Sequence, residues 1–194
     1  QGQHRAVAAL RRRPPAGAAI YKIYRRITIR FQQSKIIGLP LQHRLLTLNH
    51  KFFIIMYPAE LVNPMKAELT QNGFQELLTP QEVQDTLSQP GTTLVVINSV
   101  CGCSAGTCRP GVLRSVQGTG KKPARLTTAF AGFDKEAVQA IRQQFLMPYP
   151  PSSPCIALLK DGKLVHMIER HLIEGRTADM IAANLQAAYE EYCD

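Results

Sequence analysis

From Met56 onward, hydrophobic and polar positions follow patterns that predict short helices and strands. Apolar residues four positions apart predict amphipathic helices, because such residues lie on one helix face. Uninterrupted apolar and β-branched runs predict buried strands. These patterns give helices beginning at Asn63-Pro64 and at Pro80, a strand over 92–98, a helix after 103, a strand over 125–131, a helix capped by Asp134, strands over 155–159 and 163–168, and a last helix capped by Thr177.

Two local signals strengthen this assignment. The run Thr79-Pro80-Gln81-Glu82 has the spacing of a capping box with proline at the first helical position. Asp161-Gly162, between the last two predicted strands, is typical of a tight hairpin. The order is therefore helices, β, α, β, α, a β-hairpin and α, with parallel crossovers first and antiparallel pairing last. It predicts an α/β domain over 56–194 of the thioredoxin-like kind, with a mixed central sheet and helices on both faces.

The basic residues of the chain are concentrated at its beginning. The chain has 194 residues and a formal net charge of +9. Residues 1–55 contain 11 Lys and Arg and no Asp or Glu, which gives this segment a charge of +11. Residues 56–194 contain 12 Lys and Arg against 14 Asp and Glu, a charge of −2. The total charge therefore says nothing about the partners of the predicted domain, and we expect no nucleic-acid binding by it.

Three explanations compete for residues 1–55, which show no sustained helical or strand period. We favour a basic extension that is disordered or lies upstream of the native start, because the composition changes abruptly at Met56. A targeting presequence and a basic arm for nucleic acid or anionic lipid are the alternatives. A secretory signal does not fit, because the stretch 21–30 is too charged for an apolar core.

Composition and motifs exclude several other classes of protein. No apolar run approaches the roughly 20 residues that a bilayer crossing needs, so we expect no membrane partner. Five cysteines are too few and too unevenly spaced for a miniprotein stabilised by disulfides. No phosphate loop, HExxH motif or Ser-His-Asp set is present to indicate nucleotide binding or hydrolysis. We expect a cytoplasmic protein.

The candidate chemistry lies at Cys101-Gly102-Cys103, in the turn between a predicted strand and the next helix. A thiol at a helix N-terminus has a lowered pKa, because free N–H groups and the helix dipole favour the thiolate. The thiolate is the species that attacks a disulfide. Cys103 is near enough to act as a second, resolving thiol, and a disulfide between residues two apart closes a small ring that is expected to be reducible. Ser152-Ser153-Pro154 is a candidate for a cis-proline loop facing this turn.

Four segments give the domain a resemblance to a known family: Asn98–Cys103, Phe130–Glu136, Pro151–Pro154, and Val165-His166 through Arg170–Gly175. From about Tyr57 to Cys193, the chain resembles the bacilliredoxin family, whose thioredoxin-like fold carries Cys-Gly-Cys in place of Cys-x-x-Cys. The resemblance implies thiol–disulfide exchange, notably the removal of bacillithiol from mixed disulfides on client proteins, with weak disulfide isomerase activity. The partners would be S-thiolated proteins and a low-molecular-weight thiol, which is a co-substrate, so no metal or organic cofactor is expected.

Carried over residue by residue, the resemblance gives Cys101 the role of the attacking thiol and Cys103 that of a neighbouring thiol that resolves the adduct. Cys193 matches a cysteine near the family's C-terminus, and Ser153 and Pro154 are candidate substrate-binding residues. Cys108 and Cys155 depart from the family pattern, and Cys155 is a further candidate auxiliary thiol. The identity of the resolving thiol therefore stays open.

The alternative function is a metal-binding or iron–sulfur scaffold. Four thiolates, from Cys101, Cys103, Cys108 and Cys155, are the number that zinc or such a cluster requires. The spacing C-x-C-x4-C lacks the usual metal-binding knuckle, so we rank this hypothesis second. The sequence alone assigns no role to the segment from Arg170 to Glu174.

Overall fold

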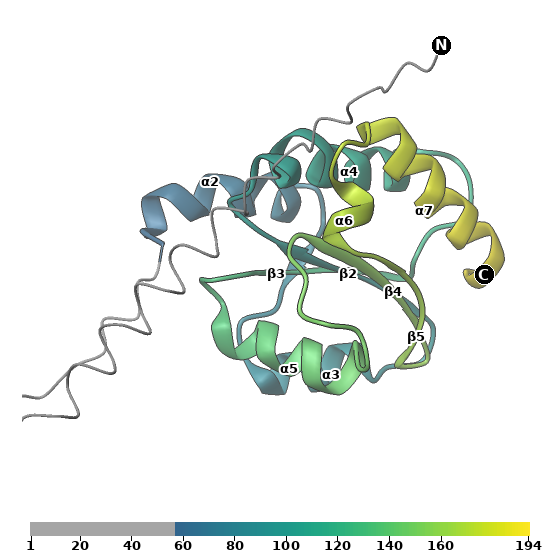
Figure 1. Cartoon of the computed structure of the whole chain (residues 1–194). Coiled ribbons are helices and arrows are strands. Elements are labelled where there is room, and N and C mark those ends of the chain that lie inside the picture. The colour runs from purple at the N-terminus through teal and green to yellow at the C-terminus, as the bar shows by residue number, and fades with distance from the viewer. Residues whose placement is uncertain (1–56) are drawn as a thin grey trace, which may run out of the picture. The chain divides into compact units, whose positions relative to one another are not determined.

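A computed structural model describes residues 57–194 of the chain (Figure 1). The predicted extension over residues 1–55 lies outside the described residues. The described part is an α/β domain built on one mixed sheet of five strands in the order β1-β3-β2-β4-β5. None of its helices combines the length and apolar composition that crossing a membrane requires.

The sheet is parallel on one side and antiparallel on the other. β3 pairs in parallel with both β1 and β2, whereas β2–β4 and β4–β5 are antiparallel pairs. All seven residues of β2 are buried, as its β-branched run predicts. The strands are β1 (Gln75–Glu76), β2 (Thr92–Asn98), β3 (Arg125–Phe130), β4 (Cys155–Lys160) and β5 (Lys163–Ile168).

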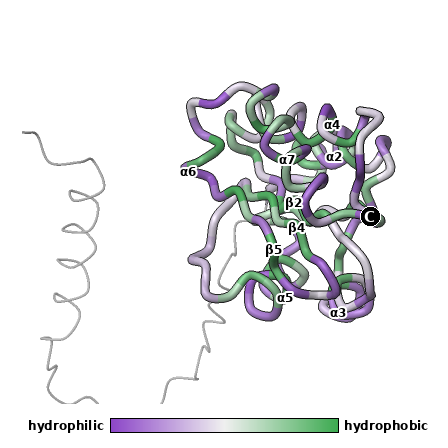
Figure 2. Tube along the Cα trace, turned by 90° about the vertical axis from the view of Figure 1, so that its right-hand side faces the viewer, coloured by the Kyte–Doolittle hydropathy of each residue, from purple (hydrophilic) through white to green (hydrophobic). Residues whose placement is uncertain are grey.

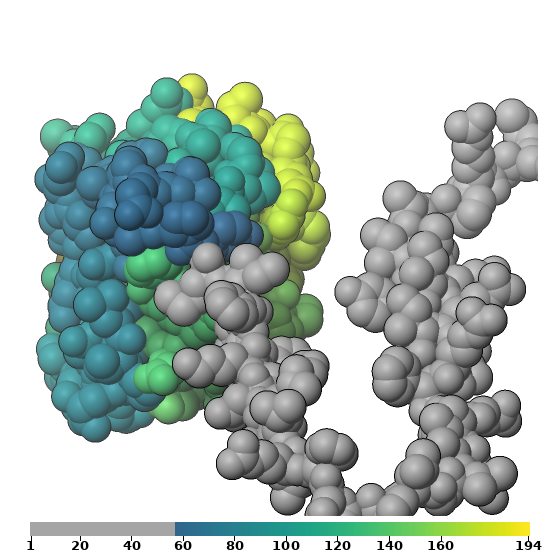
Figure 3. All heavy atoms as spheres, turned by 90° about the vertical axis from the view of Figure 1, so that its left-hand side faces the viewer, coloured from purple at the N-terminus to yellow at the C-terminus, as the bar shows by residue number. Residues whose placement is uncertain are grey.

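Helices cover both faces of this sheet, as predicted (Figure 1). One core cluster joins one face of the sheet to α3 and α5, and the other joins the opposite face to α2, α4, α6 and α7. Figure 2 shows hydrophobic residues concentrated on β2 and β4, and Figure 3 shows α2 at the surface of the domain. The helices are α2 (Ala59–Thr70), α3 (Pro80–Leu87), the π-helical turn η1 (Ser104–Cys108), α4 (Arg109–Gln117), α5 (Lys135–Phe145), α6 (Arg170–Ile173) and α7 (Ala178–Tyr192). The predicted thioredoxin-like α/β fold is thus confirmed.

Most predicted helix starts are confirmed, but one start and one cap are wrong. Asp134 immediately precedes α5, yet its side chain does not cap that helix, because its carboxylate accepts the Phe130 N–H at 2.8 Å instead. The Thr79 capping box forms in full, and the Thr177 hydroxyl accepts the Met180 N–H at 3.2 Å. Asn63 does not cap the first helix, because α2 begins at Ala59 and contains Pro64. Pro64 is the sixth of the twelve residues of α2, where its missing N–H removes one intrahelical hydrogen bond, to the Glu60 carbonyl.

Gly111 sets the distance between α4 and α7. A Cβ at this position would lie 2.7 Å from Cβ of Ile181 and 2.9 Å from the carbonyl oxygen of Ala178. A Cβ at Gly106, in the preceding turn, would meet nothing within 4 Å. The two helices therefore pack directly against the bare backbone of Gly111.

Gly111→Ala is expected to lower the free energy of unfolding by about 1–3 kcal/mol, because the added methyl group forces the two helices apart. The matched change Gly106→Ala is expected to leave stability unchanged or raise it by up to about 1 kcal/mol. Urea unfolding of both variants measures the difference. Equal stability of the two variants would contradict the close packing of α4 on α7.

Candidate active site

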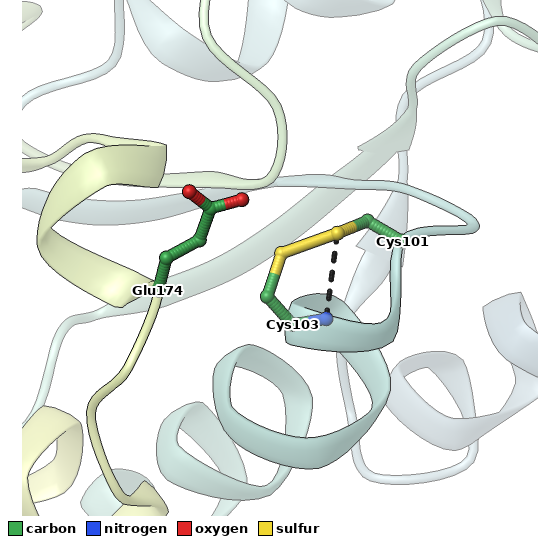
Figure 4. A group of neighbouring side chains, drawn as sticks. All are labelled: Cys101, Cys103 and Glu174. Carbon is green, nitrogen blue, oxygen red and sulfur yellow. Dashed lines mark hydrogen bonds between the residues drawn. A yellow bond between two sulfur atoms is a disulfide. The ribbon is translucent and has the colours of Figure 1, made fainter. Parts of the chain in front are cut away.

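Cys101 and Cys103 lie at the start of the helical segment that follows β2. The two residues are joined by a disulfide bond, with their Cα atoms 5.3 Å apart. The Cys101 carbonyl accepts N–H groups from Ser104 at 2.9 Å and Ala105 at 3.3 Å, which begins the helix. The N–H of Cys103 donates to Sγ of Cys101 at 3.4 Å (Figure 4). Sγ of Cys101 thus lies where helix N–H groups favour a negative charge.

Asn98, the last residue of β2, is the centre of a buried polar network below this turn. Its Oδ1 accepts the Ser99 N–H at 2.8 Å, the Ser104 hydroxyl at 2.8 Å and Nη1 of Arg109 at 3.1 Å. Its Nδ2 donates to the Met65 carbonyl at 3.1 Å. One side chain therefore ties together the end of β2, the start of η1, the start of α4 and helix α2.

Arg109 supplies a buried positive charge to this network. The residue is 2% exposed, and its Nε donates to Oε2 of Glu68 at 2.6 Å in an ion pair. Its Nη1 also lies 3.4 Å from the Ser99 carbonyl. A buried guanidinium without such partners would be strongly destabilising, so these contacts hold α4 against the end of β2. Sequence reasoning missed both Asn98 and Arg109 as supports of the site; a polar residue ending an apolar strand and an arginine beside the helical cysteine were the available signals.

The predicted cis-proline is present, since the Ser153–Pro154 peptide bond is cis. Cys155, which follows Pro154, pairs with Ile97 across β4 and β2. Pro154 therefore lies at the end of the sheet where β2 ends and the Cys101 turn begins. Pro154 is buried and Ser153 is partly buried.

A groove of about 380 Å³ lies between the proline loop and α6. Ser153 lines it, whereas Pro154 is not among its lining residues. Glu174 also lines it, and a carboxylate oxygen of Glu174 and the Sγ atoms of Cys101 and Cys103 all lie within 4.8 Å of one another. Glu174 therefore links the groove to the redox pair, although neither cysteine lines the groove. Its lining residues are Pro151, Ser152, Ser153, Glu169, Arg170, His171 and Glu174.

Comparison with known proteins identifies this arrangement. A family model described as Disulphide isomerase matches residues 57–193. The bacilliredoxin of Cytophaga hutchinsonii is 60% identical over 136 residues, which cover 70% of this chain and 99% of that protein. The chain belongs to the bacilliredoxin family. The bacilliredoxin of Salinibacter ruber is 50% identical over 139 residues, which cover 71% of this chain and 81% of that protein.

Family membership confirms the predicted resemblance and the enzyme class: the chain is a thiol–disulfide oxidoreductase. Among solved structures, the oxidised mitochondrial thioredoxin 3 of Saccharomyces cerevisiae is similar, with 15% identity and a TM-score of 0.43. That alignment covers 64% of this chain and 98% of the thioredoxin.

Within this bacilliredoxin-family domain, Cys108 and Cys155 are buried free thiols. Burial and, to a smaller extent, the neighbouring Cys155 raise the pKa of the Cys108 thiol to about 12, although Arg109 opposes this effect. Burial likewise raises the pKa of Cys155 to about 12, against the opposing charge of Arg142 and with a small contribution from Glu169. Both thiols are therefore protonated near neutral pH and are poor nucleophiles in the folded domain. Cys155 also packs in the core cluster that contains α3 and α5, whereas Cys103 packs against the cluster on the opposite face of the sheet.

Cys193 lies far from the redox pair. Its side chain contacts Thr92 at the beginning of β2, whereas Cys101 follows the end of that strand. Seven strand residues span roughly 23 Å, so the structure does not bring these two thiols together. Burial also raises the pKa of the Cys193 thiol.

The four-thiolate cluster of the metal hypothesis does not form in residues 57–194. Within that range, the group of potential metal ligands whose donor atoms approach within 4.8 Å consists of Cys101, Cys103 and Glu174. It contains neither Cys108 nor Cys155. Structural zinc sites have four protein ligands, so this set fits such a site poorly.

Proposed function

We propose that this chain removes a low-molecular-weight thiol, such as bacillithiol, from S-thiolated client proteins in the cytoplasm. The observation that carries the proposal is the Cys101–Cys103 disulfide at the start of the η1–α4 helical segment. A pair that can close and open at a helix N-terminus supplies both the attacking thiolate and the group that resolves the adduct.

The reaction proceeds in two exchange steps. The Cys101 thiolate attacks the small-thiol sulfur of the mixed disulfide, so that a bond between Cys101 and that sulfur forms. The bond to the client breaks, and the client leaves as a thiolate that takes up a proton. The sulfur of Cys103 then attacks Sγ of Cys101, which releases the small thiol and leaves the Cys101–Cys103 disulfide. Two further equivalents of a thiol reductant regenerate the dithiol, so no metal or organic cofactor takes part.

Within this proposal, the groove that contains Ser153 is the entry for the mixed disulfide. Ser153 and Pro154 immediately precede β4, at the end of the sheet from which the redox turn follows β2. Exchange at Cys101 also supports weak disulfide isomerase activity, because the same thiolate attack opens a wrong disulfide in a client.

The intact mass of the reduced chain after exposure to a glutathione mixed disulfide tests the proposal. We expect one transient adduct on Cys101, followed by the Cys101–Cys103 disulfide, and no adduct on Cys108, Cys155 or Cys193 by peptide mapping. Cys103→Ser is expected to retain the adduct, because the resolving sulfur is absent. A chain that forms no adduct and instead contains zinc or iron by elemental analysis would overturn the proposal in favour of the metal-scaffold function.

A further inference from the structure

Glu174 is the carboxylate nearest to the redox pair in the part of the chain that the structure describes. It comes from the segment after α6, whereas the cysteines come from the turn after β2 (Figure 4). Its carboxylate oxygen lies within 4.8 Å of both Sγ atoms. One bridging water connects a carboxylate and a thiol at this distance, and catalytic hydrogen bonds are often long before substrate binds.

The surrounding backbone and an ion pair fix the position of Glu174. Nε of Arg170 donates to Oε1 of Glu174 at 2.7 Å, and the Glu174 N–H donates to the Arg170 carbonyl at 2.9 Å. The Arg170 N–H in turn donates to the Ser152 hydroxyl at 2.8 Å, which ties α6 to the proline loop. The Arg170 contact occupies one acceptor position, and a carboxylate has about four. Glu174 is therefore held at the site with acceptor capacity left for a thiol proton.

The resolving step requires a proton to move. Near neutral pH a thiol with an ordinary pKa is mostly protonated, so Cys103 must lose its proton to attack Sγ of Cys101. The departing small thiol must gain a proton. We propose that Glu174 accepts the Cys103 proton and donates it to the departing sulfur. The S–H bond of Cys103 and the bond from Cys101 to the small thiol break, while the Cys101–Cys103 bond and a new S–H bond form.

This proposal rests on the exchange mechanism proposed above. The pH dependence of the resolving step depends on the charged groups around Glu174. The charged or titratable residues of this segment are Glu169, which precedes α6, and Arg170 and His171 within α6. Arg176 follows Glu174 in the chain. From the redox turn they are Cys101 and Cys103. The proline loop contributes only Pro151, Ser152 and Ser153 to the groove, none of which is ionisable near neutral pH.

Glu174→Gln tests the proposal, with Glu169→Gln as its matched control. Both variants remove one negative charge from the same groove, and the Glu174 side chain is 50% exposed, so folding does not depend on it. In single turnover with a glutathionylated fluorescent protein, client release reports the attack by Cys101. Glutathione release, followed as the loss of the Cys101 adduct in acid-quenched samples by intact mass, reports the attack by Cys103. Both rates are measured between pH 5 and pH 9.

For Glu174→Gln at pH 7, we expect glutathione release to slow by about 100-fold or more, while client release is not slowed. The rate of glutathione release by this variant should rise about tenfold per pH unit, because hydroxide must then supply the thiolate. Glu174→Asp is expected to recover part of the rate, whereas Glu169→Gln, which also lines the groove, is expected to change client release and glutathione release by the same factor. The expected magnitudes follow those of general acid–base catalysis.

Two results would overturn the role of Glu174 while leaving exchange at Cys101 intact. One is a Glu174→Gln variant with an unchanged rate and pH profile of glutathione release. The other is equal slowing in Glu174→Gln and Glu169→Gln, which would indicate a general effect of groove charge. Failure of the unsubstituted chain to form an adduct on Cys101 is a different outcome, because it removes the exchange mechanism itself.

Discussion

Replacing Cys101 with serine is expected to reduce turnover of an S-thiolated client by at least about a thousandfold, to the background rate. A serine hydroxyl at neutral pH is protonated and is a far weaker nucleophile toward sulfur than a thiolate. Cys101 is only partly buried, so the smaller oxygen atom leaves the fold intact. Steady-state release of the client thiol, measured beside the unsubstituted chain, checks this result.

Cys193→Ala is the matched control for the loss of a thiol. The Cys193 side chain contacts Thr92 at the far end of β2 from Cys101, and we expect its removal to leave turnover within about twofold. A large loss of turnover in Cys193→Ala, with normal folding, would show that this thiol reaches the redox pair during the cycle. Full activity of Cys101→Ser would remove Cys101 as the nucleophile.

Local chemistry explains why so much of the fold is predictable from the sequence. The Thr79 capping box, the run over 92–98 and the Asp161-Gly162 turn each stabilise one conformation through contacts within a few residues. Asp161 has a φ of 52°, which is a conformation that this turn type requires and that aspartate tolerates. Such signals fix element type and order, and the order then limits the possible sheet topologies.

Elements that depend on distant partners were not predictable in this way. Strand β1 has only two residues, Gln75 and Glu76, and no apolar pattern; it exists because it pairs in parallel with β3. Helix α6 has only four residues and no capping signal. The π-helical turn η1 precedes Pro110, whose missing N–H leaves an earlier carbonyl without its usual donor. Nothing in the apolar spacing indicates this wider turn.

In the candidate site, too, only the residues that are close in sequence were predictable. Cys101 and Cys103 are two positions apart, so their proximity is visible in the sequence. Glu174 is more than 70 positions away, and only the pairing of β2 with β4 and the return of the chain through β5 place it beside the sulfurs. The same topology places Cys155 on the opposite face of the sheet from the core against which Cys103 packs. Five cysteines in a sequence therefore do not reveal which of them share a site.

Asn98→Leu is expected to lower the free energy of unfolding by about 2–4 kcal/mol. Leucine has a similar volume, but it removes the oxygen that accepts hydrogen bonds from Ser99, Ser104 and Arg109. The cost is largest at Arg109, which stays buried with its charge and retains one ion-pair partner, Glu68. Urea unfolding, followed by far-UV circular dichroism, measures the change.

Asn98→Asp distinguishes the contribution of the acceptor oxygen from that of the whole amide group. The aspartate keeps an oxygen in the position of Oδ1 and adds a charge that Arg109 balances. It loses the donor to the Met65 carbonyl, so we expect a smaller loss, of about 1 kcal/mol. Combining Asn98→Leu with Arg109→Met should cost less than the sum of the single changes, because the second removes the charge that the first leaves unsatisfied. Additive losses in the double variant would show that Asn98 and Arg109 act independently.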